Sequence, residues 1–65
     1  MDIDDVMELR KAIERYGEAR EAISEFINIY RDELSRETLA TLGNHSYYIT
    51  NQIAELQGII VKLGD

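Results

Sequence analysis

The 65 residues can form one domain at most, and their 13 acidic and seven basic side chains give a formal charge of −6. A chain of this length buries only about 60% of its unfolded surface, so small domains are commonly reinforced by disulfides, a metal or a second subunit. The chain has no cysteine, and its single histidine, His45, cannot supply the ligands of a structural zinc site. We therefore expect one domain over residues 1–65, without metal or cofactor, whose core is enlarged by oligomerisation.

The chain begins with MDIDDVMELRK, which has acidic residues where a signal peptide has basic ones, and no long apolar run follows. No uninterrupted apolar stretch exceeds three residues, as at Ile59–Ile60–Val61, which is far too short to cross a bilayer. The negative charge also repels nucleic-acid phosphates and anionic lipids. We predict a soluble cytoplasmic protein that has no membrane partner and is poorly suited to bind nucleic acid.

Apolar residues in the first half recur in alternating steps of three and four, the heptad spacing of a helix that packs along one seam. This first seam consists of Val6, Leu9, Ile13, Tyr16, Ile23, Ile27, Tyr30 and Leu34. A stripe of small residues runs beside it through Ala12, Ala19 and Ala22, and widens to Phe26 and Ile29. We predict a helix over residues 3–34 whose alanine stripe lets another helix approach closely at one end.

The step from Leu34 to Leu39 is five residues, which breaks the heptad spacing and predicts a turn or kink. Ser35 can cap a following helix by accepting hydrogen bonds from the N–H groups of its first turn. Glu37 then lies near the positive end of the helix dipole. The sequence therefore predicts a tight turn at Ser35.

The second seam keeps the heptad spacing to the end of the chain and predicts a helix over residues 36–63. Its members are Leu39, Leu42, Ser46, Ile49, Ile53, Leu56, Ile60 and Leu63. Gly43 suits a helix C-terminus, and Ser46 or Asn44 could cap a new helix after it. We expect a long helical hairpin with a kink or break at 43–46. A compact three-helix bundle, broken at the same place, is the alternative.

Two helices alone leave the outer sides of both seams exposed, and such patches mark interaction surfaces. A helix of about 30 residues is about 45 Å long, whereas a compact chain of this size has a radius of gyration of about 11 Å. We therefore predict a homodimer that forms a four-helix bundle, with the apolar members of both seams as its core and dimer contacts. The sequence leaves open whether the subunits are parallel or antiparallel.

Each seam is interrupted by one polar residue, Arg20 in the first and Ser46 in the second. Polar residues at such positions can fix helix register and oligomeric state at a cost in stability. In a hairpin that turns at Ser35, Arg20 lies level with Thr50 and Asn51, so it can bond to them or to a carboxylate of another subunit. The alternative is that its long side chain reaches solvent.

Two groups of residues form the candidate partner surface. The first is acidic and consists of Glu14, Glu18, Glu21 and Glu25; the second is uncharged and includes Tyr47, Tyr48 and Asn51. The glutamates include like-charged pairs one helical turn apart, which mildly destabilise a helix. This face could bind a basic protein, or mimic phosphates and block a nucleic-acid site. An ordinary solvated face is the simpler alternative.

The segment 39–53, which contains LGNHSYY, loosely resembles the turn and recognition helix of a helix-turn-helix protein. A recognition helix from Ser46 would present Thr50 and Asn51, and asparagine can read adenine. However, this segment has no lysine or arginine to neutralise phosphates. A small DNA-binding regulator is therefore the alternative function.

The only histidine raises the question of catalysis, because His45 could act as a general base beside Ser46 or Tyr47. The sequence has no nucleophile elbow, no glycine-rich phosphate loop and no carboxylate–histidine pair for a di-iron bundle. We expect a non-enzymatic, all-α protein–protein interaction module that acts as a homodimer. A small regulator, inhibitor or adaptor of bacterial or phage type fits these features, and its partner would be a larger protein with a basic surface.

Overall fold

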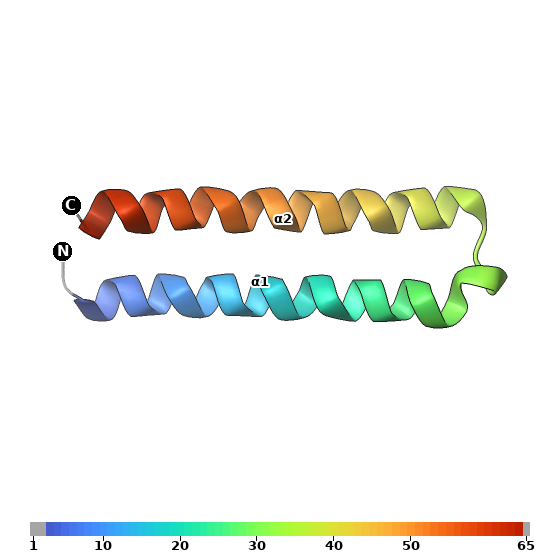
Figure 1. Cartoon of the computed structure of the whole chain (residues 1–65), viewed down its shortest axis with the longest axis horizontal. Helices are drawn as coiled ribbons and strands as arrows, with labels where there is room; N and C mark the ends of the chain where they lie inside the picture. Colours follow the sequence, from blue (N-terminus) through green and yellow to red (C-terminus); the bar gives the residue numbers. More distant parts are fainter. Residues whose placement is uncertain (1–2, 65) are drawn as a thin grey trace.

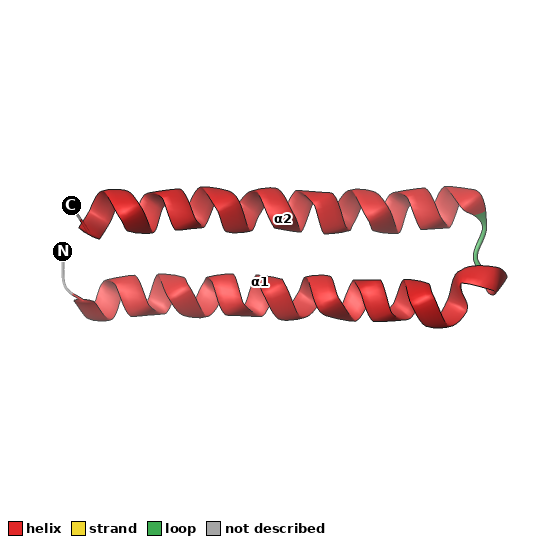
Figure 2. Ribbon diagram, viewed as in Figure 1, coloured by secondary structure: helices red, strands yellow, loops and turns green. Residues whose placement is uncertain are grey.

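The computed structural model describes residues 3–64, which form a hairpin of two long antiparallel helices (Figure 1). Helix α1 spans Ile3–Tyr30 and helix α2 spans Arg36–Gly64. A short 3-10 turn, η1, spans Arg31–Glu33 between them. The described residues contain no strand (Figure 2), so the predicted all-α hairpin is confirmed.

The hairpin is long and thin, with principal extents of 48 × 15 × 10 Å and a radius of gyration of 15.1 Å. A compact chain of the same length would have a radius of gyration of about 11 Å. In this shape, no side chain of residues 4–64 is fully buried. Neither helix has a stretch long and apolar enough to cross a membrane within the part of the chain that the structure describes.

The turn forms at the predicted place, with a small difference at the end of α1. The α-helix ends at Tyr30, and the 3-10 turn then brings the chain to Leu34, whose backbone is extended with φ −94° and ψ 142°. Tightening into a 3-10 turn is a common way to satisfy the last carbonyl groups of a helix. The regular helix is therefore shorter than the predicted 3–34, although helical backbone continues to Glu33.

Ser35 caps α2 as predicted. Its Oγ accepts a hydrogen bond from the backbone N–H of Thr38 at 3.1 Å and donates one to Thr38 Oγ1 at 2.9 Å. Its carbonyl oxygen accepts the N–H of Leu39 at 3.0 Å. The bond to Leu39 is the first i→i−4 bond of α2, and the Ser35 side chain satisfies one of the four N–H groups that a helix N-terminus leaves open, that of Thr38.

The predicted irregularity at 43–46 is absent, because α2 runs without a break through this segment (Figure 1). Gly43 has no positive φ, so it does not end a helix, and the three-helix alternative is wrong. The regular spacing of the second seam explains why α2 continues. Leu42, Ser46 and Ile49 stay in step along α2, and packing against α1 outweighs the roughly 1 kcal/mol that glycine costs inside a helix.

The two seams meet between α1 and α2, where their aliphatic members are half-buried. Tyr16 and Tyr30 of the first seam remain 38% and 41% exposed. Arg20 Nη1 donates a hydrogen bond to Thr50 Oγ1 at 3.1 Å, which is one of the alternatives predicted for this residue. Ser35 lies midway in sequence between Arg20 and Thr50, so residues equally distant from Ser35 lie at the same level of the hairpin.

Candidate interaction surfaces

The hairpin has two broad flanks, one on each side of the plane that contains the two helix axes. Because α1 and α2 are antiparallel, an approximate two-fold rotation normal to this plane relates them. Equivalent heptad positions of the two helices therefore lie on the same side. We call these sides the aromatic flank and the acidic flank, after the residues that distinguish them.

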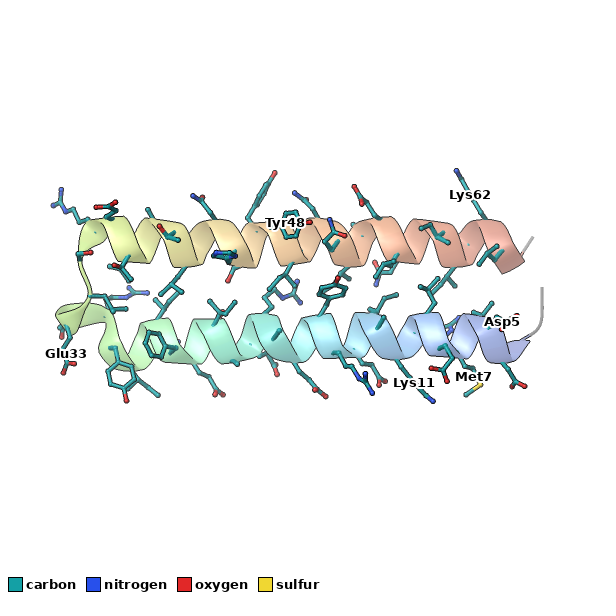
Figure 3. All side chains as sticks on the ribbon, turned by 180° about the vertical axis from the view of Figure 1, so that it is seen from behind. Asp5, Met7, Lys11, Glu33, Tyr48 and Lys62 are labelled. Atoms are coloured by element: carbon teal, nitrogen blue, oxygen red, sulfur yellow. The ribbon has the colours of Figure 1, made fainter. Side chains whose placement is uncertain are left out.

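The aromatic flank carries most of the large exposed hydrophobic side chains. Its uncharged members are Ala12, Tyr16, Ala19, Ala22, Phe26, Ile29 and Tyr30 from the first half of the hairpin, and Thr41, His45, Tyr48, Gln52 and Ile59 from α2 (Tyr48 is labelled in Figure 3). The rings of Phe26 and Tyr30 pack with centroids 4.9 Å apart at an interplanar angle of 46°. Ile29 is 70% exposed and Tyr48 60% exposed. Exposed apolar side chains gathered on one side in this way are typical of interaction surfaces.

The alanine stripe forms an open groove on this flank of α1. The groove has a volume of about 450 Å³ and is lined by Glu8, Lys11, Ala12, Arg15, Tyr16 and Ala19. It exists because the two alanines have no side chain long enough to fill the space beside Tyr16. A helix of another chain could approach closely here, as the sequence predicted.

The charged residues of the aromatic flank lie toward the open end of the hairpin. They are Asp5, Glu8 and Arg15 on α1 and Glu55 and Lys62 on α2. Glu8 pairs with Lys11 at 3.0 Å, the only ion pair among the described residues. From Tyr16 to Tyr30 on one helix, and from Thr41 to Gln52 on the other, this flank has no acidic residue, lysine or arginine.

The acidic flank is more polar. A groove of about 410 Å³ crosses from α1 to α2 there and is lined by Arg10, Ile13, Glu14, Gln57, Ile60 and Val61. Its lining agrees with the register, because Arg10 and Ile60 are equally distant from Ser35. Glu21, Tyr47 and Ala54 continue the same flank toward the turn. Tyr47 is 70% exposed and Val61 65% exposed.

The structure does not bring the predicted partner surface together as one patch. Glu14, Glu21 and Tyr47 lie on the acidic flank, whereas Tyr48 lies on the aromatic flank. Glu18, Glu25 and Asn51 occupy the outer sides of their helices, as Lys11 does on α1 in Figure 3. All seven residues of that surface are exposed, and none of its carboxylates forms an ion pair within residues 3–64.

The histidine of the LGNHSYY segment is exposed on the aromatic flank of α2. His45 lines a shallow groove of about 360 Å³ with Thr41, Asn44 and Tyr48. The hydroxyl of Thr41 donates to the carbonyl of Glu37 at 3.0 Å. Ser46 faces the seam instead, and its Oγ is buried without a hydrogen-bond partner. His45 and Ser46 therefore point to different sides of the helix.

Two further observations bear on the alternatives. The segment 39–53 is one uninterrupted helix, so the turn on which the helix-turn-helix interpretation depends is not present. Among the described residues, no group of three or more histidine or acidic side chains is arranged to hold a metal ion.

Which side of α1 shares a flank with which side of α2 was not predicted from the sequence, and neither were the charged residues at the open end of the aromatic flank. The spacing of these charged residues could have indicated that they share one side of each helix. Glu8 and Arg15 are seven residues apart on α1, and Glu55 and Lys62 are seven apart on α2, so each pair repeats one heptad position beside the seam.

Comparisons with protein-family models, curated proteins and solved structures gave no match to this chain.

Proposed function

We propose that the protein is a non-enzymatic helical interaction module that acts as a homodimer and binds a second protein through its acidic flank. The observation that carries this proposal is the lack of any fully buried side chain in residues 4–64 of the hairpin. A chain this small has little stability to spare, and a half-exposed seam gives it only part of a core. The cysteine-free composition fits the reducing conditions of the cytoplasm, where we place this activity.

A second copy of the chain is the partner that best completes the core. It is present whenever the first copy is, and it supplies the same half-buried seams. Two such hairpins can form a four-helix bundle in which all four seams turn toward a shared interior. The exposed Tyr16, Phe26 and Tyr30 would then become contacts between subunits.

The acidic flank has the composition expected of a surface that binds a basic amphipathic helix. Glu14 and Glu21 outnumber Arg10, the basic residue that lines the groove on this flank, while Tyr47 and Val61 supply exposed apolar area beside them. Charge complementarity would guide the encounter, and the groove at Glu14 and Val61 would take apolar side chains. A regulator, inhibitor or adaptor could act in this way by occupying a basic surface of a larger protein.

The homodimer is tested by measuring solution mass with light scattering over a range of concentrations, while circular dichroism follows helicity. We expect a mass of two chains with high helicity. A folded monomer at every concentration would contradict the proposal.

The partner surface is tested with a synthetic amphipathic helix that carries lysine and arginine on one face and leucine on the other. Binding is followed by fluorescence anisotropy at low salt. The variant E14K/E21K should weaken binding by about tenfold or more, because it reverses charge on the acidic flank itself. The matched variant E18K/E25K makes the same change in net charge on the outer side of α1, and it should weaken binding less. Equal losses would show that only net charge matters, and would overturn the assignment to this flank.

A further inference from the structure

We propose that the second copy of the chain packs against the aromatic flank with the two turns at the same end of the bundle. In this arrangement α1 of one subunit lies beside α2 of the other, and the two-fold axis runs along the length of the bundle. The inference rests on the proposed homodimer and specifies its interface and orientation.

The hairpin exposes more surface than a compact protein of its mass, and the excess is large enough for a stable dimer interface. The chain exposes 5349 Å² of solvent-accessible surface. A compact protein of its mass, 7.5 kDa, is expected to expose about 4,200 Å². The excess of about 1,100 Å² exceeds the roughly 800 Å² that each partner contributes to a standard stable interface.

The composition of the two flanks selects the aromatic one. The central part of a protein interface is rich in aromatic residues and poor in charged ones. The aromatic flank meets this description from Tyr16 to Tyr30 and from Thr41 to Gln52. On the acidic flank, Glu14 and Glu21 would have to lose their hydration against α2 of a second copy, which has no lysine or arginine on that side between Tyr47 and Val61.

The register of the hairpin then determines which residues face each other. With the turns at the same end, a residue of α1 faces the residue of the partner's α2 that is equally distant from Ser35. This rule follows from the Arg20–Thr50 hydrogen bond and agrees with the residues that line the groove on the acidic flank. It can therefore be applied to the charged residues of the aromatic flank.

Opposite charges meet in this arrangement. Glu8 and Lys62 are equally distant from Ser35, and so are Arg15 and Glu55. Glu8 and Glu55 thus each face a basic residue of the second copy, twice over by symmetry. Arg15, Glu55 and Lys62 form no ion pair within residues 3–64 of a single hairpin, and Glu8 has only its exposed contact with Lys11.

Small and large residues also meet. Ala22 and Tyr48 are equally distant from Ser35, so the exposed ring of each Tyr48 would lie against the alanine of the second copy. If the two turns lay at opposite ends of the bundle, different residues would face each other. The charged open end would then cover the apolar turn end, and Arg15 would lie near Ala22 instead of Glu55.

The orientation can be tested by exchanging one pair of charges between α1 and α2. In the variant R15E, two glutamates face each other at both symmetric contacts, and in E55R two arginines do. Each variant should weaken dimerisation by about tenfold at low salt. The matched control is R10E, which makes the same charge reversal on the acidic flank and should leave the dissociation constant of the dimer unchanged.

The decisive measurement is an equimolar mixture of R15E and E55R, followed by analytical ultracentrifugation. The mixed dimer has two symmetric contacts. At one, the new glutamate faces the new arginine; at the other, the original Arg15 faces the original Glu55. The mixture should therefore dimerise as tightly as the unaltered protein. If the unaltered protein is a dimer and the mixture stays as weak as its components, the orientation is wrong although the homodimer stands. If the unaltered protein is a monomer, the proposed homodimer itself fails.

Discussion

Arg20 of α1 donates a hydrogen bond to Thr50 of α2 across the hairpin, with 3.1 Å between Nη1 and Oγ1. The Thr50 hydroxyl donates its own proton to the carbonyl of Ser46, one turn earlier, at 3.0 Å. Its lone pair is thus free to accept from the guanidinium. This polar chain crosses a largely apolar seam and holds the two helices at one level.

Replacing one or both partners of this hydrogen bond should show how much it contributes to the stability of the protein. T50V keeps the shape of the side chain but removes the acceptor, and should lower the free energy of unfolding by about 1 kcal/mol. R20M/T50V removes both polar groups, so it should be close to the original stability or above it. Urea unfolding at a fixed protein concentration measures both effects. A double variant that is less stable than T50V would contradict the bond's assigned role.

Ser46 gives a prediction of the opposite sign. Its Oγ is buried in the seam without a hydrogen-bond partner, and such a group costs about 1–3 kcal/mol. S46A should therefore raise the free energy of unfolding by about 1 kcal/mol. The control S24A changes an exposed serine on α1 and should have little effect. If S46A proves less stable, the hydroxyl has a partner in the assembled protein, and Ser46 would then be a contact that fixes oligomeric state.

Gly43 tests the continuity of α2. It has helical backbone with no positive φ, and an added Cβ would meet no atom within 4 Å. G43A should therefore stabilise the protein by about 0.5–1 kcal/mol, because alanine loses less entropy in a helix than glycine does. Thermal unfolding followed by circular dichroism measures the change. Destabilisation would mean that the chain needs a glycine conformation here, as the predicted break at 43–46 required.

The heptad spacing was sufficient to predict the hairpin, since the phase change between Leu34 and Leu39 places the turn and Ser35 has the right chemistry to cap α2. The same spacing also argued against a break at Gly43. The prediction failed there because local signals for a helix end were weighed against the seam, and in a long helix packing outweighs them.

The candidate surface was harder to predict. Glu14, Glu18, Glu21 and Glu25 look like one acidic face in sequence, but their positions around α1 divide them between the acidic flank and the outer side. Which flank each residue joins depends on where α2 lies. That information is carried by the register of two helices, and a single periodic pattern does not contain it.

Ile53 tests whether the two seams form the core. It is half-buried between the helices, so I53D would place a charge where the seams meet. We expect this variant to lose several kcal/mol, because an unpaired carboxylate must be taken out of water, and to unfold or dissociate. Y47D adds the same charge on the same helix at a side chain that is 70% exposed, and it should keep its helicity. Circular dichroism and light scattering on both variants make the comparison. A folded I53D protein of unchanged mass would show that the seam faces solvent, and the packing of α1 on α2 would have to be revised.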